Sequence, residues 1–263
     1  NGFSFGANYT YGISLKGNTG LNQRFQHAAD GTISLRSDQK AYEKLMEKLD
    51  KRPHMAIFNA IWNSPDIQSK GSLVRNLVRD WQVSLIWRVY SGSAYTLGYS
   101  YTNDGGNVNI TGSSDWAGRM ILLDGLGGGC SSSNQYAQFN ALAAKGPGYG
   151  SLSMESGRNY LRGCTDTRAD MSFVRRIRIP KIGENRRLEL RADVYNAFNT
   201  TVLNSRVTTA TFNNPTSMTL TNNQYNADGT LNQSRVKPKN AGFGAANGAQ
   251  ALRNIQLQLR FQF

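Results

Sequence analysis

The residue types that most often carry chemistry are few in this chain. His27 and His54 are the only histidines, they fall in different predicted elements, and no set of carboxylates or cysteines accompanies either at metal-ligand spacing. A zinc site needs three or four such ligands, and a hydrolytic triad needs a histidine between a nucleophile and a carboxylate. We therefore expect no metal site, no bound cofactor and no enzyme activity.

A glycine-rich run from Ile121 to Gly129 resembles a strand that leads into a phosphate-binding loop. A dinucleotide site needs an apolar-faced helix directly after the glycines, so that the helix N-terminus meets the pyrophosphate. The polar run from Cys130 to Gln135 follows instead, which favours a flexible outer loop. The run from Asn103 to Asn109 offers oxygen ligands but lacks the spacing of a calcium-binding hand, so it predicts a turn.

The two cysteines, Cys130 and Cys164, lie in one region rich in glycine and serine. In an oxidising compartment they could form a disulfide across this region, and two free thiols are the alternative. The sequence leaves both states open.

The charge balance is strongly basic, with 30 Lys and Arg against 17 Asp and Glu. Such an excess is typical of proteins that bind nucleic acid, an anionic membrane surface or an acidic ligand. Nucleic-acid binding would need aromatic side chains among the basic ones on one face, whereas here the two kinds alternate. We expect anionic lipid headgroups as the partner, at about 1 kcal/mol per charge, and no nucleic acid. The basic clusters are Lys70, Arg75 and Arg79, and Arg175, Arg176, Arg178, Lys181, Arg186 and Arg187.

The elements that must position these residues are predicted to be strands. Every odd position from Phe3 to Leu15 is apolar or aromatic, and the residues between them are small or polar. A period of two predicts a strand with one apolar and one polar face. Ile86 and Arg175 break the pattern in later strands, and Arg175 is expected near a membrane boundary, where its stem can snorkel. The further strands are predicted around 54 to 63, 81 to 89, 169 to 179, 187 to 194 and 254 to 263.

The connections between the six predicted strands alternate strictly between long and short. They span about 17 to 52, 65 to 80, 98 to 167, 180 to 186 and 200 to 252. Outer-membrane barrels have short periplasmic turns and long outer loops, whereas a β-sandwich requires no such alternation. No stretch approaches the roughly 18 to 20 apolar residues of a membrane helix. We therefore predict an all-β fold, a transmembrane antiparallel β-barrel in the outer membrane, over residues 1–263 as one domain.

A periplasmic C-terminus would place both cysteines in the largest outer loop. Within the first long loop, residues 37 to 51 predict a short amphipathic helix. Six strands cannot close, because the smallest membrane barrels have about eight and open edges are not tolerated in hydrocarbon. We expect this segment to belong to a larger barrel. The residues expected in its interfacial aromatic girdles are Tyr9, Tyr11, Trp62 and Trp81.

Four stretches carry a family resemblance: residues 2–11, 157–163 and 187–199, and the terminal strand. They resemble the C-terminal barrel portion of TonB-dependent outer-membrane receptors of the Oar-like group. The resemblance covers nearly the whole chain and implies the last six strands of a 22-stranded barrel. It also implies an N-terminal plug and a TonB box, which have no counterpart here, and energy-coupled uptake of a bulky ligand through the TonB complex. No ligand contact of the family matches, so the ligand stays open.

The terminal strand also resembles the signal by which the barrel assembly machinery recognises its clients. An apolar ladder on an exposed edge strand suits β-augmentation. The assembly-signal candidates are Leu257, Leu259, Phe261 and Phe263. The residues predicted to line the lumen, or to contact the plug, are Arg88, Arg187, Glu189, Arg191, Asp193, Gln258 and Arg260.

Two other functions share parts of this pattern. A structural or adhesive outer-membrane barrel without transport has the same strands, and a plug domain upstream would decide for transport. A soluble basic β-protein that binds polyanions would need no detergent and would bind with steep salt dependence.

Overall fold

The computed structural model describes residues 2–13, 25–27, 33–35, 40, 52–65, 78–102, 109–112, 117–178, 187–250 and 252–262. Several sequence predictions lie outside these residues. They are the helix at 37 to 51 apart from Lys40, the turn at 103 to 109 apart from Asn109, and Phe263, Lys70, Arg75, Lys181 and Arg186.

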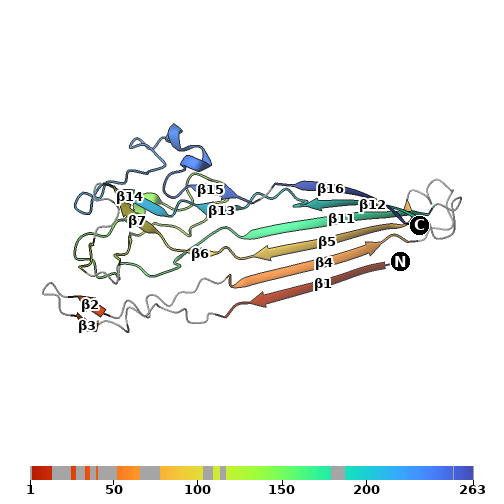
Figure 1. Cartoon of the computed structure of the whole chain (residues 1–263), viewed down its shortest axis with the longest axis horizontal. Helices are drawn as coiled ribbons and strands as arrows, with labels where there is room; N and C mark the ends of the chain where they lie inside the picture. The colour runs from red at the N-terminus through yellow and green to blue at the C-terminus, as the bar shows by residue number, and fades with distance from the viewer. Residues whose placement is uncertain are drawn as a thin grey trace.

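Six antiparallel strands form the main sheet, in the order β1-β4-β5-β11-β12-β16 (Figure 1). All six were predicted from the two-residue period. Their bounds are β1 Gly2–Tyr11, β4 His54–Asn63, β5 Trp81–Tyr90, β11 Asp166–Arg178, β12 Arg187–Tyr195 and β16 Asn254–Gln262. Among the described residues, no helix is long and apolar enough to cross a membrane.

Two strand limits differ from the sequence prediction. The first strand ends at Tyr11, although the alternation continues to Lys16. Gly12 still donates its N–H to Pro53 O at 2.8 Å, but proline has no N–H to return, so the ladder cannot continue in both directions. The fourth main strand, β11, begins at Asp166 instead of Ala169, because it pairs with β5 as far as Tyr90.

One face of the sheet is apolar across all six strands. Residues that oppose each other in the ladder share a face, and one such row runs from Phe5 through Ala60, Leu85, Met171 and Val194 to Ile255. Large side chains on its two outermost strands are uncovered, since Phe5 is 68% exposed and Leu257 is 81% exposed. We call this the apolar face. Strands of about 9 to 11 residues suffice to cross a bilayer.

The aromatic side chains predicted to form interfacial girdles lie toward both ends of the apolar face, and their place at the membrane interface stays a prediction. Tyr9 and Tyr11 lie on β1 near His54, with Tyr9 Oη 2.7 Å from His54 Nδ1. Trp62 and Trp81 lie at the opposite end. The Arg175 guanidinium lies 5.4 Å from the centroid of the Trp81 ring, so this arginine on the apolar face lies beside an aromatic ring at one end of the sheet.

The opposite face, which we call the polar face, carries most of the charged side chains of the strands. Ile86 lies on it, opposite Asn59 on β4 and Asp170 on β11, and is 48% exposed. Ile57 and Ile61 add further apolar side chains to this face on β4. The polar face is therefore charged over β11 and β12 and partly apolar over β4.

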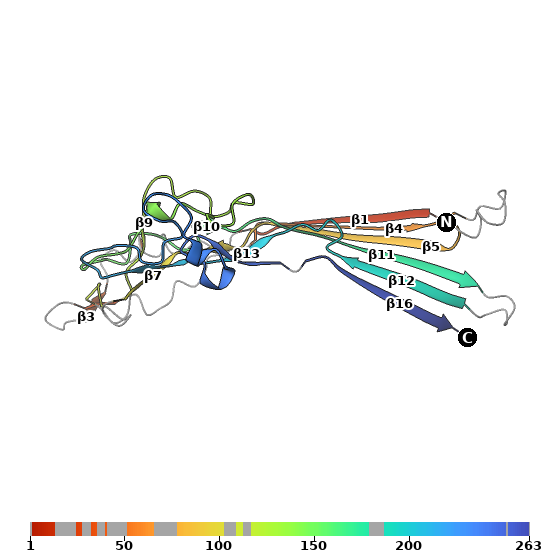
Figure 2. The same ribbon diagram turned by 90° about the horizontal axis from the view of Figure 1, so that it is seen from above.

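The six-stranded sheet has two edges, β1 and β16, and the described part of the chain forms no closed barrel. Figure 2 shows that the strands do not lie in one plane: β11, β12 and β16 turn away from β1, β4 and β5. Antiparallel sheets twist and curve in this way before they close.

The buried core lies beyond the strands, where the connections 91–165 and 196–253 fold together. We call their described residues the outer assembly. Its largest fully buried side chains include Phe212, Phe243, Met120 and Leu161. The outer assembly also contains short paired strands, which the sequence predicted as loops because they are too short to show a period. The pairs are β6 Ala94–Tyr95 with β10 Leu161–Arg162, β7 Gly98–Tyr101 with β14 Thr209–Phe212, β8 Ile121–Leu122 with β9 Ala144–Lys145, and β13 Leu203–Arg206 with β15 Ala246–Ala249.

One pairing of the outer assembly joins its two connections directly. Strand β7 from the first pairs with β14 from the second in parallel, with Gly98 opposite Thr209 and Tyr101 opposite Phe212. A further strand pair lies in the first long loop, where β2 Phe25–His27 forms a hairpin with β3 Ile33–Leu35.

Candidate functional site

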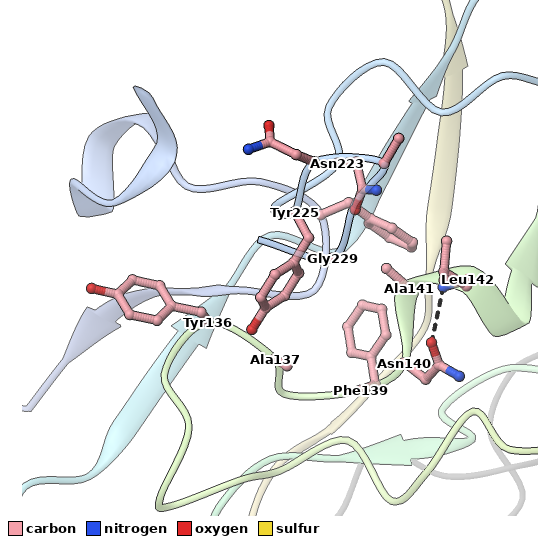
Figure 3. Close-up of a pocket in the computed structure, with 12 residues that line it drawn as sticks. Tyr136, Ala137, Phe139, Asn140, Ala141, Leu142, Asn223, Tyr225 and Gly229 are labelled. Carbon is pink, nitrogen blue, oxygen red and sulfur yellow. Dashed lines mark hydrogen bonds between the residues drawn. The ribbon is translucent and has the colours of Figure 1, made fainter. Parts of the chain in front are cut away.

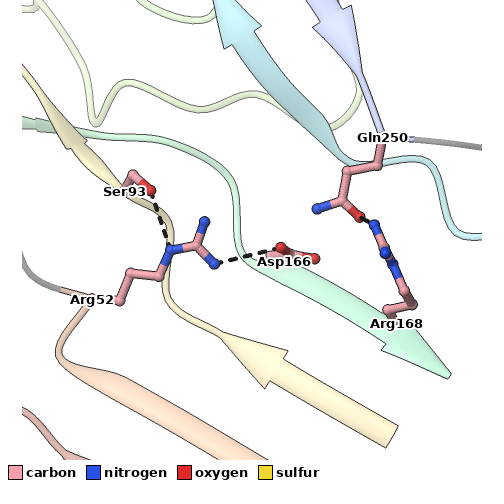
Figure 4. A network of polar contacts seen from close by, with 5 residues as sticks. All are labelled: Arg52, Ser93, Asp166, Arg168 and Gln250. Carbon is pink, nitrogen blue, oxygen red and sulfur yellow. Dashed lines mark hydrogen bonds and ion pairs between the residues drawn. The ribbon is translucent and has the colours of Figure 1, made fainter.

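Strand β11 carries a ladder of charged side chains along the polar face. Asp166, Arg168 and Asp170 occupy every second position at its outer end. The Arg52 Nη1 donates to Asp166 Oδ2 at 3.4 Å, and its Nε donates to Ser93 Oγ at 3.2 Å (Figure 4). Arg52 therefore joins the first carboxylate of the ladder to the first residues of the outer assembly.

The next two side chains of the ladder extend these ties to the other connection. Arg168 Nη2 donates to Gln250 Oε1 at 2.7 Å (Figure 4). Asp170 forms an ion pair with Arg88 on β5, and its other oxygen accepts the backbone N–H of Asn196 at 3.0 Å. Both connections of the outer assembly are thus anchored on the polar face of β11.

At the inner end of β11, Arg176 links three strands. Its Nε lies 3.0 Å from Glu189 Oε2 on β12, and its Nη2 donates to Gln82 Oε1 on β5 at 3.2 Å. The Glu189 side chain is 16% exposed and the Arg176 side chain is 46% exposed, so the pair is open to solvent on the arginine side.

The seven residues predicted to line the lumen all lie on the polar face. Arg187, Glu189 and Arg191 on β12 stand opposite Gln262, Arg260 and Gln258 on β16. Arg191 Nε lies 2.9 Å from Asp193 Oδ2 on its own strand, and Arg88 lies on β5. In a membrane barrel the apolar face meets lipid and the opposite face meets the lumen. The role of these residues as lumen lining stays a prediction.

Sequence reasoning missed the acidic partners that the structure brings to this face. Asp170 pairs with Arg88, and Asp166 pairs with Arg52, yet neither carboxylate was singled out. The signal was present, since Asp166, Arg168 and Asp170 alternate with Thr167 and Ala169. The predicted strand began only at Ala169, which left out Asp166 and Arg168, and the partner of Asp170 is Arg88, 82 residues away in the sequence.

The apolar residues proposed as an assembly signal lie together on β16. Leu257, Leu259 and Phe261 are 81%, 67% and 47% exposed on the apolar face. Strand β16 pairs with β12 on one side, and within the described chain its other edge is open. Recognition of β16 by the barrel assembly machinery stays a prediction.

A disulfide joins Cys130 and Cys164, whose Cα atoms are 5.0 Å apart. Cys164 stands two residues before β11, so the bond ties the segment after Gly129 to the base of the outer assembly. Gly129 itself has φ of 90°, and a Cβ there would lie 2.8 Å from Leu161 Cβ and 2.9 Å from Arg162 O. The glycine-rich run is therefore packed at its end, and no helix follows it in the described residues 130–135.

Two tyrosines of the outer assembly, Tyr95 and Tyr101, donate hydrogen bonds to backbone carbonyls and have raised pKa values. Burial raises the pKa of Tyr95, although the guanidinium of Arg206 above its ring opposes this. Burial also raises the pKa of Tyr101 to about 12. Tyr95 donates to Gly129 O at 2.6 Å and Tyr101 donates to Pro147 O, so both phenols hold neighbouring loops together.

An open cavity of about 290 Å³ lies in the outer assembly (Figure 3). One wall, from Tyr136 to Leu142, comes from the first connection, and the other, which includes Asn223, Tyr225 and Phe243, comes from the second. The lining has aromatic rings, asparagine amides and small residues, and no charged side chain. In the part of the chain that the structure describes, no group of three histidine, cysteine or acidic residues is arranged to hold a metal ion.

Comparison with known proteins agrees with this geometry. A family model described as "Outer membrane beta barrel domain" matches residues 1–256, nearly the whole chain. Neither the curated proteins nor the solved structures that were searched gave a match. An apolar face for lipid, an opposite face of paired charges and long connections at one end are what such a domain requires. The chain therefore belongs to the family of outer-membrane β-barrel domains, and its place is the outer membrane.

Proposed function

We propose that this chain is the C-terminal wall of a TonB-dependent receptor that captures a bulky ligand and admits it across the outer membrane. The observation that carries the proposal is the folded outer assembly, which has its own buried core and disulfide and is anchored on the polar face through Arg168, Asp166 and Asp170. A barrel that serves only as a membrane support would need no such packed structure at one end.

The anchoring of the outer assembly on the polar face places a captured ligand next to the path that it would take across the membrane. A ligand held by the outer assembly would lie above charged side chains that are already paired, so these charges need not be neutralised by the ligand. In this proposal the chain carries no bond-making chemistry. Its partners are outer-membrane lipid along the apolar face, the barrel assembly machinery at β16, and the TonB complex through a plug supplied elsewhere in the protein.

Binding of TonB by the full-length protein tests this proposal. The natural full-length product would be purified in detergent and mixed with the periplasmic domain of TonB, and a porin would serve as the control. Co-purification that is lost when the TonB box is deleted is the expected result. A full-length protein that reaches the outer membrane but never binds TonB would instead favour a structural or adhesive barrel.

A further inference from the structure

We propose that the cavity between Tyr136 and Tyr225 binds an uncharged saccharide at the cell surface. The inference deepens the proposed function by naming the class of ligand, and it relies on that function only for placing the outer assembly outside the cell. Three features of the cavity support this inference: its lining, the amide groups at its rim and the rigidity of its walls.

The lining combines the two kinds of group that recognise a sugar ring. Tyr136, Phe139 and Tyr225 supply aromatic surface, whose faces carry negative charge density and attract the polarised C–H groups on one side of a pyranose ring. Asn140, Asn223 and Asn226 supply amides at the same cavity. An amide offers two donors and one acceptor, which suits neighbouring hydroxyls that each donate and accept.

These amides keep hydrogen-bonding capacity for a ligand. Asn140 Oδ1 accepts the N–H of Leu142 at 3.1 Å, which leaves its Nδ2 donors (Figure 3). Asn226 Nδ2 donates to Thr230 Oγ1 at 3.0 Å, which leaves its Oδ1 acceptor. Within the described part of the chain, the side chain of Asn223 makes no hydrogen bond.

The charges around the cavity argue against an ionic ligand. No acidic or basic side chain lines it, and Asp228 in the adjoining turn directs its carboxylate to Thr230 at 2.6 Å. A charged ligand would lose water without gaining an opposite charge, and a purely apolar ligand would cover the amides without satisfying them. A neutral ligand with many hydroxyls avoids both penalties.

The walls of the cavity are fixed by contacts between the two connections. Gln138 is 2% exposed, its backbone N–H donates to Gly244 O at 2.7 Å, and its side chain donates to Ser131 O and Asn134 O at 2.8 Å. The rings of Phe139 and Phe243 meet edge to face with centroids 5.1 Å apart. Because the site is largely formed without ligand, binding need not order the loops, which favours affinity for a small ligand.

The experiment is a binding titration of the full-length protein in a zwitterionic detergent without a sugar headgroup. The probes are neutral trisaccharides of glucose, mannose, galactose and N-acetylglucosamine, each compared with a uronic-acid trisaccharide. At least one neutral probe is expected to bind, and the Tyr225→Ala and Asn223→Ala variants are expected to bind it at least tenfold more weakly. The matched control is Tyr149→Ala, since Tyr149 is an exposed aromatic of the outer assembly outside the cavity.

The outcomes separate this inference from the receptor proposal. Binding of no neutral saccharide, preference for the uronic acid, or unchanged affinity in folded Asn223→Ala protein would overturn the saccharide site, whatever TonB does. The Asn223 variant keeps the test decisive if Tyr225→Ala fails to fold, because the Asn223 amide supports no other described residue. Saccharide binding without TonB binding would support the saccharide site and contradict the proposed TonB-dependent transport.

Discussion

At the scale of single residues, the outer assembly depends on groups that tolerate little change. Tyr101 is 3% exposed, and its phenol donates to Pro147 O. Gly129 lies where the backbone has positive φ and where Tyr95 and Leu161 leave no room for a side chain. Neither residue takes part in the main sheet, so a change at either should alter the outer assembly and leave the barrel wall in place.

The stability of the outer assembly should decline above pH 10, and Tyr101 should contribute to this decline. Its pKa is raised by burial to about 12 from 10.0, so the folded state favours the neutral phenol. Below pH 10 neither state is ionised; between pH 10 and about 12 only the unfolded state loses the proton, and unfolding becomes easier. Thermal melts of the full-length protein at several alkaline pH values, with phenolate absorbance, would measure this.

The Tyr101→Phe variant provides the check on the cause. At neutral pH it should be less stable by about 1 kcal/mol, because Pro147 O loses its donor. Above pH 10 its stability should fall less steeply than that of the wild type. Tyr149→Phe removes an exposed phenol that is the smallest of the named causes of the raised Tyr101 pKa, so it should change the curve less than Tyr101→Phe does. An equally steep decline in Tyr101→Phe would show that Tyr101 does not titrate as argued.

Alanine substitutions at Gly127 and Gly129 distinguish destabilisation by backbone strain from destabilisation by side-chain crowding. Gly127 and Gly129 have φ of 86° and 90°, so alanine is strained at both, by about 1 to 3 kcal/mol. A Cβ at Gly127 meets nothing within 4 Å, whereas at Gly129 it would lie 2.7 Å from Tyr95 Oη. Gly129→Ala should therefore lower the melting temperature of the outer assembly clearly more than Gly127→Ala. Equal shifts in limited-proteolysis melts would mean that the crowding is relieved by small movements.

At the scale of elements, the main strands could be predicted and the outer assembly could not. Strands of nine or ten residues, such as β16 and β1, repeat the alternation of apolar and polar residues often enough to be recognised in the sequence. Strands of two to four residues carry no period of their own, and two of them, β7 and β14, are held by partners more than a hundred residues away. The lumen candidates on β12 and β16 followed from alternation, whereas Asp170 and the amide-lined cavity depend on long-range contacts.

Adjacent positions on β16 test which face of the sheet meets lipid. Leu257 points from the apolar face and Gln258 from the polar face, in the middle of the same strand. Arginine at a lipid-facing position near the bilayer midplane destabilises a barrel by about 2 to 4 kcal/mol, whereas lumen positions tolerate it. Leu257→Arg should lower the urea midpoint of the full-length protein in lipid vesicles, and Gln258→Arg should leave it nearly unchanged. The reverse order would mean that the two faces have been assigned the wrong way round.

At the scale of the whole molecule, the decisive feature is that the sheet has edges. Strands β1 and β16 each pair on one side only within the described chain. In hydrocarbon every unpaired backbone group costs several kcal/mol, so two open edges are not compatible with a stable membrane wall. If the polar face lines the lumen, as predicted, the environment of the charged ladder of β11 depends on strands beyond these six.

Residues 1–263 expressed alone should therefore not form a monomeric barrel, whereas the full-length product should. Six strands are fewer than the roughly eight of the smallest membrane barrels, and no rearrangement of the turns supplies the missing pairs. After insertion into vesicles, the full-length protein should show a heat-dependent shift in gel mobility, and the 263-residue chain should show none and be cleaved by added protease. A protected, heat-modifiable monomer of the short chain would contradict the strand count. A protected oligomer would show that several copies close the wall together, and the polar face would then line a lumen shared between chains.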